Sequence, residues 1–243
     1  MAWVTLFGAL IGVTSLVPIF PYVGGGGYVP LAVPLAAIAP LLLGPAGGIT
    51  ASAIGGLIGM FIAPAAFPLG LLDVLVTAVA PAVMVGLAVN NDRYWRITIP
   101  LYALMAAFCF LFPFYIPGAA AGFEQPSEPL HFFVSAIYWF VPLVVVVTSF
   151  GRKVVPEWAR SKDKRQKYLG ILVSVLIGLL VWWIPWTRPY WYLFKYPAAL
   201  GIATFIGYSW WVPTLAAITT AITIPILEAL ERSGLPKVGR ALW

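Results

Sequence analysis

Few side chains in this sequence have the chemistry of a reactive centre. His131 is the only histidine and Cys109 the only cysteine, and the chain has neither an H-x-x-x-H nor a C-x-x-C pair to hold a metal. It also lacks a G-x-x-x-x-G-K-[ST] phosphate-binding loop, so it has no ATP-hydrolysis site of that type. We therefore predict a protein that is not an enzyme and that uses no metal or other cofactor.

Asp73 is the only charged side chain between Met1 and Asn91. An acid inside a membrane segment costs free energy and is a functional-site hypothesis by default. Asp73 lies one turn inside a predicted span, near its outer boundary, where it could contact a ligand. The structural alternative is that it caps the first turn or interacts with the positive end of the helix dipole. The sequence leaves both interpretations open.

A second polar group opens the sixth predicted span. Glu124, Glu128 and His131 lie in this outer loop, and Tyr138 and Trp139 follow in the helix. A loop with a few polar groups and aromatic walls suits a small ligand, although loops are commonly polar for solvation alone. The candidate ligand-binding residues are Asp73, Glu124, His131, Tyr138 and Trp139.

The composition identifies the environment in which these residues must be positioned. Of the 243 residues, 62% are hydrophobic and 9% are charged, against about 45–50% and about 25% in soluble domains. A chain of this size cannot hide so much apolar surface in its own core. This excludes a soluble enzyme, a nucleic-acid-binding protein, a disordered chain and a disulfide scaffold. We predict an all-α, multi-pass bundle of transmembrane helices in the cell (inner or plasma) membrane.

Hydrophobic runs broken by proline, glycine and charge predict about eight spans, within a range of six to eight. The second and third are short and are joined by a tight turn at Gly44-Pro45. The last is too long for one upright crossing and should kink at Pro213 or Pro225 or end as an interfacial helix. The predicted spans are approximately Ala2–Ile19, Pro30–Leu43, Ala46–Ile62, Leu69–Val89, Ile97–Ile116, Leu130–Phe150, Tyr168–Pro185 and Pro197–Leu230.

Charge sets the predicted orientation. Twelve of the fourteen basic residues fall in 90–96, 151–167 and 232–243, and only Arg188 and Lys195 fall in the loops on the other side. The positive-inside rule therefore places both chain ends in the cytoplasm. A cluster of aromatic residues from Trp182 to Tyr192 is predicted to form a belt at the outer membrane interface. The expected organisation is a six-span core (1–150), a basic cytoplasmic loop (151–167) and a two-span C-terminal extension (168–243).

Small residues at four-residue spacing are abundant, and such faces let helix backbones approach closely. Most of them should pack the bundle. Gly8 and Gly12, on the first helix, are the candidate docking site for a partner membrane subunit.

Residues 29–89 also resemble a known family. The run VPLAVPLAAIAPLLLGPAGGITASAIGGLIGMFIAP, followed by FPLGLLDVLVTAVAPAVMVGLA, is similar to the substrate-binding S component of energy-coupling factor (ECF) vitamin transporters. In that family a second helix ends in a Gly-Pro turn, here Gly44-Pro45, and a glycine-rich third helix follows. The fourth helix opens with a Pro-Ile-Gly-like stretch and an acid or amide, here Pro68-Leu69-Gly70 and Asp73. The resemblance covers roughly residues 2–117; S components generally have six spans, so Tyr168–Leu230 exceeds the family pattern.

The resemblance implies a subunit that takes up a vitamin-sized nutrient from outside. Transport would be powered by separate ATPase subunits through a transmembrane coupling subunit, which the small residues of the first helix would contact. The expected partners are therefore the lipid bilayer, these subunits and a small solute, with no nucleic acid. The alternative is a non-catalytic accessory subunit of a larger membrane complex.

Overall fold

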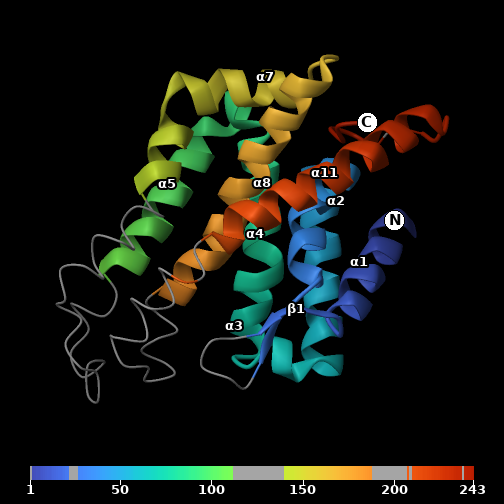
Figure 1. Ribbon diagram of the computed structural model, residues 1–243, viewed down its shortest axis with the longest axis vertical. Helices are drawn as coiled ribbons and strands as arrows, with labels where there is room; N and C mark the ends of the chain where they lie inside the picture. The colour runs from blue at the N-terminus through green and yellow to red at the C-terminus, as the bar shows by residue number, and fades with distance from the viewer. Residues whose placement is uncertain (1, 22–26, 112–139, 188–206, 208–209, 237) are drawn as a thin grey trace.

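The computed structural model describes residues 2–21, 27–111, 140–187, 207, 210–236 and 238–243. Helices dominate this part of the chain (Figure 1). Four of them are long and apolar enough to cross a membrane: Ala32–Ile62, Leu71–Ala88, Lys164–Trp183 and Trp211–Arg232. The structure thus supports an all-α membrane protein.

A small sheet follows the first helix and was not predicted. Helix α1 (Ala2–Thr14) leads into strand β1 (Pro18–Pro21), which pairs antiparallel with β2 (Tyr28–Pro30). Each strand contains proline, which removes ladder donors and makes a strand hard to predict. The Tyr28 hydroxyl donates to the Ser15 carbonyl at 3.0 Å and ties the hairpin to the end of α1.

Helix α2 (Ala32–Ile62) is a hairpin of two antiparallel arms, residues 32–43 and 45–62. Gly44 joins them with φ +70° and ψ 165°, a conformation open to glycine, and Pro45 cannot donate to the preceding helix. The Ser52 hydroxyl donates to the Ala36 carbonyl at 3.3 Å, whereas 16 residues of continuous helix would separate them by about 24 Å. The predicted turn at Gly44-Pro45 is confirmed.

The second arm of α2 packs against α1 through glycines. A Cβ on Gly55 would lie 2.5 Å from Ile11 Cβ and 2.7 Å from the Gly8 carbonyl oxygen, and one on Gly12 would lie 2.6 Å from Ile58 Cγ2. The contacts advance together along both helices, so α1 and this arm run parallel. Close backbone approach replaces side-chain interdigitation here.

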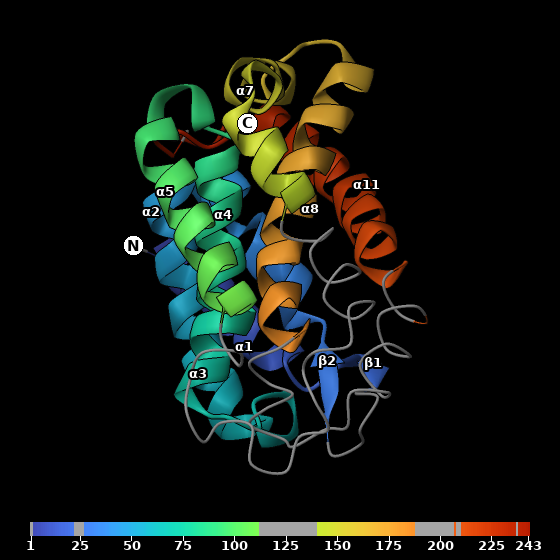
Figure 2. The ribbon, with the colours of Figure 1, turned by 90° about the vertical axis from the view of Figure 1, so that its left-hand side faces the viewer.

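The remaining helices complete the bundle. The order is η1 (Pro64–Ala66), α3 (Leu71–Asp73), η2 (Val74–Val79), α4 (Ala80–Ala88) and α5 (Asn91–Leu111), then η3 (Phe150–Val154), α7 (Val155–Ala159), α8 (Lys164–Thr187) and α11 (Trp211–Arg232). Segment 140–147 is also helical. Helices α4, α5 and α8 lie side by side, and α11 crosses the bundle obliquely (Figures 1 and 2).

One core joins the N-terminal and C-terminal halves. It contains Val33 and Leu41 of α2, Val85 of α4, and residues of α8 and α11. Trp182 and Trp183 belong to this core, with exposed fractions of 1% and 8%. The prediction of an interfacial belt is therefore wrong for these two residues, because helices on several sides enclose this part of α8. The segment 151–167, predicted as a loop, contains η3, α7 and the start of α8.

Candidate functional site

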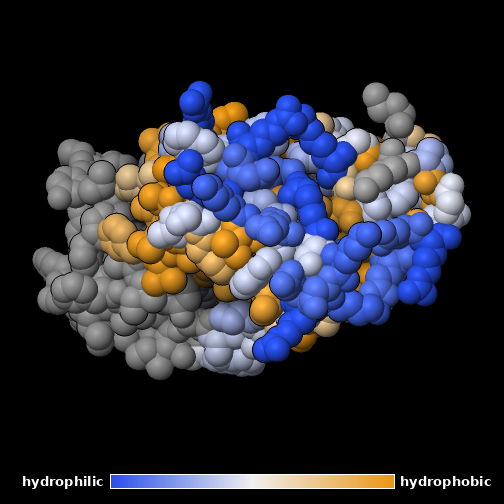
Figure 3. Space-filling view, turned by 90° about the horizontal axis from the view of Figure 1, so that it is seen from above, coloured by the Kyte–Doolittle hydropathy of each residue, from blue (hydrophilic) through white to orange (hydrophobic). Residues whose placement is uncertain are grey.

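The α4–α5 turn, α7, the start of α8 and the end of α11 gather at one end of the molecule, which we call the basic end (Figures 1 and 2). Seen from above, this end is strongly hydrophilic (Figure 3). Its elements carry, among the described residues, Arg93, Arg96, Arg152, Lys153, Arg160, Lys162, Lys164, Arg165, Lys167 and Arg232.

A polar network, in which Asn90 and Asn91 are buried, holds the basic end together. The Arg160 guanidinium donates to the carbonyls of Val89 at 2.7 Å and Pro156 at 3.0 Å, and to Asn90 Oδ1. Asn91 Nδ2, at the start of α5, donates to the carbonyl of Val146 in the helical segment 140–147 at 3.0 Å. Burial lowers the pKa of Arg160, and nearby Asp92 acts in the opposite direction. Arg160 is thus committed to helix packing.

The segment 238–243, which we call the C-terminal tail, supplies donors to the α2 turn. Leu242 N–H donates to the Leu41 carbonyl at 2.9 Å, and Trp243 Nε1 donates to the Leu42 carbonyl at 2.7 Å. Leu41 would normally pair with the N–H of residue 45, which proline lacks. The tail therefore satisfies carbonyls that the hairpin turn leaves without helical partners.

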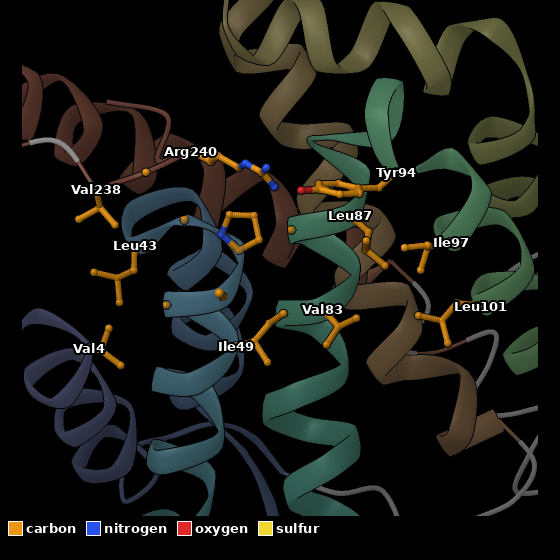
Figure 4. Close-up of a pocket in the computed structure, with 16 residues that line it drawn as sticks. Val4, Leu43, Ile49, Val83, Leu87, Tyr94, Ile97, Leu101, Val238 and Arg240 are labelled. Carbon is orange, nitrogen blue, oxygen red and sulfur yellow. The ribbon is translucent and has the colours of Figure 1, made fainter. Parts of the chain in front are cut away.

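A cavity of about 680 Å³ lies beside this turn, between α1, α2, α4, α5 and the tail (Figure 4). We call it the α2–α5 groove. Its walls are apolar, and its upper rim carries Tyr94 and Arg240, whose guanidinium carbon lies 5.3 Å from the Tyr94 ring centroid. The volume is within the range of about 300–1,000 Å³ typical of ligand sites. The labelled apolar residues are Val4, Leu43, Ile49, Val83, Leu87, Ile97, Leu101 and Val238.

Asp73 lies at the opposite end, near the β-hairpin. Its side chain is fully buried, and Oδ2 accepts the Leu69 N–H at 2.6 Å. This bond closes the turn that leads into α3, which is a local structural role for the carboxylate. The ligand role of Asp73 stays a prediction.

Gly8 and Gly12 face into the molecule. Both are buried against the second arm of α2. The side of α1 that another subunit could contact is the opposite one, where Trp3, Leu6 and Leu10 are exposed.

The other candidate residues, Glu124, His131, Tyr138 and Trp139, lie outside the described residues. Within the described ranges, no group of three or more His, Cys, Asp or Glu side chains is placed to hold a metal ion.

The α2–α5 groove was not predicted from the sequence. Pro45 indicates that a carbonyl at the end of the first arm of α2 loses its helical hydrogen-bond donor. No local feature of the sequence identifies the tail as the replacement donor.

Comparison with known proteins adds no relative: no family model, no curated protein and no solved structure matches this chain.

Proposed function

We propose that this chain is a multi-pass protein of the cell membrane with eight crossings and both ends on the cytoplasmic side. The crossings are α1, the two arms of α2, the run from α3 to α4, α5, the segment ending near Phe150, α8 and α11. The parallel packing of α1 and the second arm supports the first three of these crossings, because the first and third crossings of an alternating chain run in the same direction. The basic end supplies the positive charge expected on the cytoplasmic side.

Within this topology, the function we propose is that of the solute-binding subunit of an ECF-like importer. The observation that carries it is the α2 hairpin. The residues of the resemblance, from the Gly44-Pro45 turn to Gly55, form one tightly packed unit with α1. This organisation is what a Gly-Pro turn followed by a glycine-rich third helix implies.

The solute site we propose lies at the end opposite the basic end. Asp73, Glu124 and His131 would orient a small solute by hydrogen bonds, and Tyr138 and Trp139 would stack on it. Few charges are available to neutralise an ion, so a neutral or weakly charged, partly planar nutrient is the best match. Separate ATPase subunits would provide the energy, because the sequence carries no phosphate-binding loop.

The coupling subunit would dock on α1. Because Gly8 and Gly12 are buried against α2, we place the contact on the opposite face, at Trp3, Leu6, Leu10 and Val13, which are 46–64% exposed. The same apolar face supports the second candidate function, an accessory subunit of a larger, non-ATPase membrane complex.

Gentle detergent extraction from native membranes, followed by identification of the accompanying polypeptides, tests the two proposals. Recovery of ATPase subunits with the chain, together with binding of a vitamin-sized solute to the purified complex, is the expected result. A stoichiometric complex without an ATPase would favour the accessory role. The absence of both a bound solute and an ATPase partner would overturn the importer proposal.

A further inference from the structure

The α2–α5 groove is amphipathic along its length. Tyr94 and Arg240 point toward each other at its upper rim, while Leu101 and Val83 lie further down its walls (Figure 4). Ile97 and Leu101 are 56% and 39% exposed, so the groove opens on the side of the bundle rather than into its core. A molecule in the groove would contact a cation at one end and hydrocarbon at the other.

The cation at the rim is available to an outside anion. Among the described residues, carboxylates form ion pairs with Lys164, Lys167 and Arg232. No described carboxylate pairs with Arg240. Arg240 is exposed and lies over the Tyr94 ring. A guanidinium forms bidentate hydrogen bonds with phosphate oxygens, and a tyrosine hydroxyl can add another donor.

The dimensions favour a lipid over a helix of another protein. From Tyr94 to Leu101 the groove wall covers eight residues of α5, a rise of about 10 Å. This is about two thirds of one leaflet of a hydrocarbon core about 30 Å thick. A transmembrane partner helix would require an apolar contact over most of that core. The groove instead changes from apolar to cationic at the depth where an acyl chain meets its headgroup.

Two other cavities lack this combination. A cavity of about 520 Å³ at the basic end has a mostly charged and polar lining rather than a long apolar wall, and its carboxylates Glu228 and Glu231 pair with Lys164, Lys167 and Arg232. A cavity of about 360 Å³ between α2 and α11 is lined by apolar side chains and Thr219, with no charge.

We propose that the α2–α5 groove binds an anionic phospholipid of the leaflet at the basic end. Its phosphate lies at Arg240 and Tyr94, and its acyl chain packs along Val83, Ile97 and Leu101. This site is separate from the proposed solute site and does not depend on the importer proposal.

Native mass spectrometry of the full chain tests this proposal. The protein is incorporated into vesicles of equimolar phosphatidylcholine and phosphatidylglycerol, extracted gently, and its retained lipids are identified. Phosphatidylglycerol should be retained in preference to phosphatidylcholine, and Arg240→Gln should lower its retention about tenfold, as expected for loss of one charge-assisted hydrogen bond. Arg165→Gln, which changes an exposed cation of the basic end outside the groove, should leave retention unchanged.

A second variant tests the acyl part of the site without altering its charge. Ile97→Trp fills the open wall of the groove and should also lower phosphatidylglycerol retention, with thermal melting used to verify that both variants fold. Equal retention by wild type, Arg240→Gln and Ile97→Trp would overturn the proposal, as would equal retention of the two lipids. In a parallel sample with added oleate, replacement of the phospholipid by oleate would assign the groove to a free carboxylate, and a dimer without lipid would assign it to a second copy of the chain.

Discussion

At the scale of single residues, several buried polar side chains donate hydrogen bonds to nearby backbone carbonyls. Ser174, Thr220 and Thr223 each donate a hydroxyl to the carbonyl four residues earlier in the same helix. Asn90 does the same with the Gly86 carbonyl at 2.8 Å. Because hydrocarbon offers no hydrogen-bond partner, such internal bonds let a membrane helix keep polar side chains without exposing their donors to lipid.

Asp73 is a buried acid that also bonds to nearby backbone. Two substitutions distinguish the loss of its acceptor oxygen from the loss of its charge. Asp73→Leu removes the acceptor of the Leu69 N–H and should lower the free energy of unfolding by about 1.5–3 kcal/mol. Asp73→Asn keeps an acceptor oxygen and should cost less. Thermal melting of the detergent-solubilised protein measures both, and equal melting of wild type and Asp73→Leu would show that the bond does not stabilise the fold.

Trp243 tests the value of the tail as a donor. Trp243→Phe removes the N–H that Leu42 accepts at a buried site and should destabilise the protein by about 1–3 kcal/mol, the cost of an unsatisfied buried carbonyl. Trp210→Phe is the matched control, because its indole donates to the Gly207 carbonyl at an exposed position. The melting temperature should fall for Trp243→Phe alone, and an equal effect of both variants would contradict the capping role.

At the scale of elements, the α2 hairpin determines how the first three helical segments pack. Its first arm runs antiparallel to the second, and α1 packs on the glycine-rich side of the second arm. The turn brings the tail and the upper rim of the α2–α5 groove to the same place, since Gly44 lies against Gly239. A change at the turn therefore reaches both the hairpin and the groove.

Gly44→Ala should disturb this junction for two reasons. Its φ of +70° disfavours a side chain, and the added Cβ would collide with the Gly239 carbonyl oxygen. Gly234→Ala has a matching φ of +69° with no atom within 4 Å, so it measures backbone strain alone, about 1–2 kcal/mol. Gly44→Ala should melt lower than Gly234→Ala, and equal melting temperatures would show that the tail moves aside at no cost.

Gly55→Ala tests the close approach of α1 and α2. The added methyl would meet the Gly8 carbonyl oxygen at 2.7 Å, a backbone atom that cannot change rotamer. We expect destabilisation of about 1–3 kcal/mol, the usual cost of overpacking. Gly207→Ala, where nothing lies within 4 Å, should leave the melting temperature near that of wild type. A Gly55→Ala protein as stable as wild type would mean that the two helices can separate freely.

At the scale of the whole molecule, charge is distributed asymmetrically between the two ends. The basic end contains the α4–α5 turn, α7 and the start of α8, and the β-hairpin lies at the other end (Figures 1 and 2). In the orientation that we propose from the positive-inside rule, the basic end and the tail lie in the cytoplasm.

Cysteine labelling on sealed right-side-out vesicles tests this orientation. In a protein with Cys109 replaced, Val17→Cys near the β-hairpin should react with a membrane-impermeant maleimide, because Val17 is 44% exposed. Lys162→Cys, exposed at the basic end, should react only after the vesicles are opened. Labelling of Lys162→Cys in intact vesicles would invert the orientation and move the proposed solute site to the cytoplasmic side.

Features that depend on local composition could be predicted from the amino-acid sequence. Hydropathy indicated a membrane protein of helices, and Gly44-Pro45 indicated the hairpin turn, because proline and a glycine with positive φ act within a few residues. Clusters of Lys and Arg likewise predicted a single basic end, because this prediction uses only which loops carry the basic residues.

Which surfaces meet became evident from the packing of the helices. Trp182 and Trp183 have the composition of an interfacial belt, yet neighbouring helices enclose them in the core. The tail donates to a carbonyl 201 residues away in the sequence, and the same tail carries Arg240 to Tyr94 at the groove. Such pairings depend on packing between distant segments, for which hydropathy and residue spacing carry no local signal.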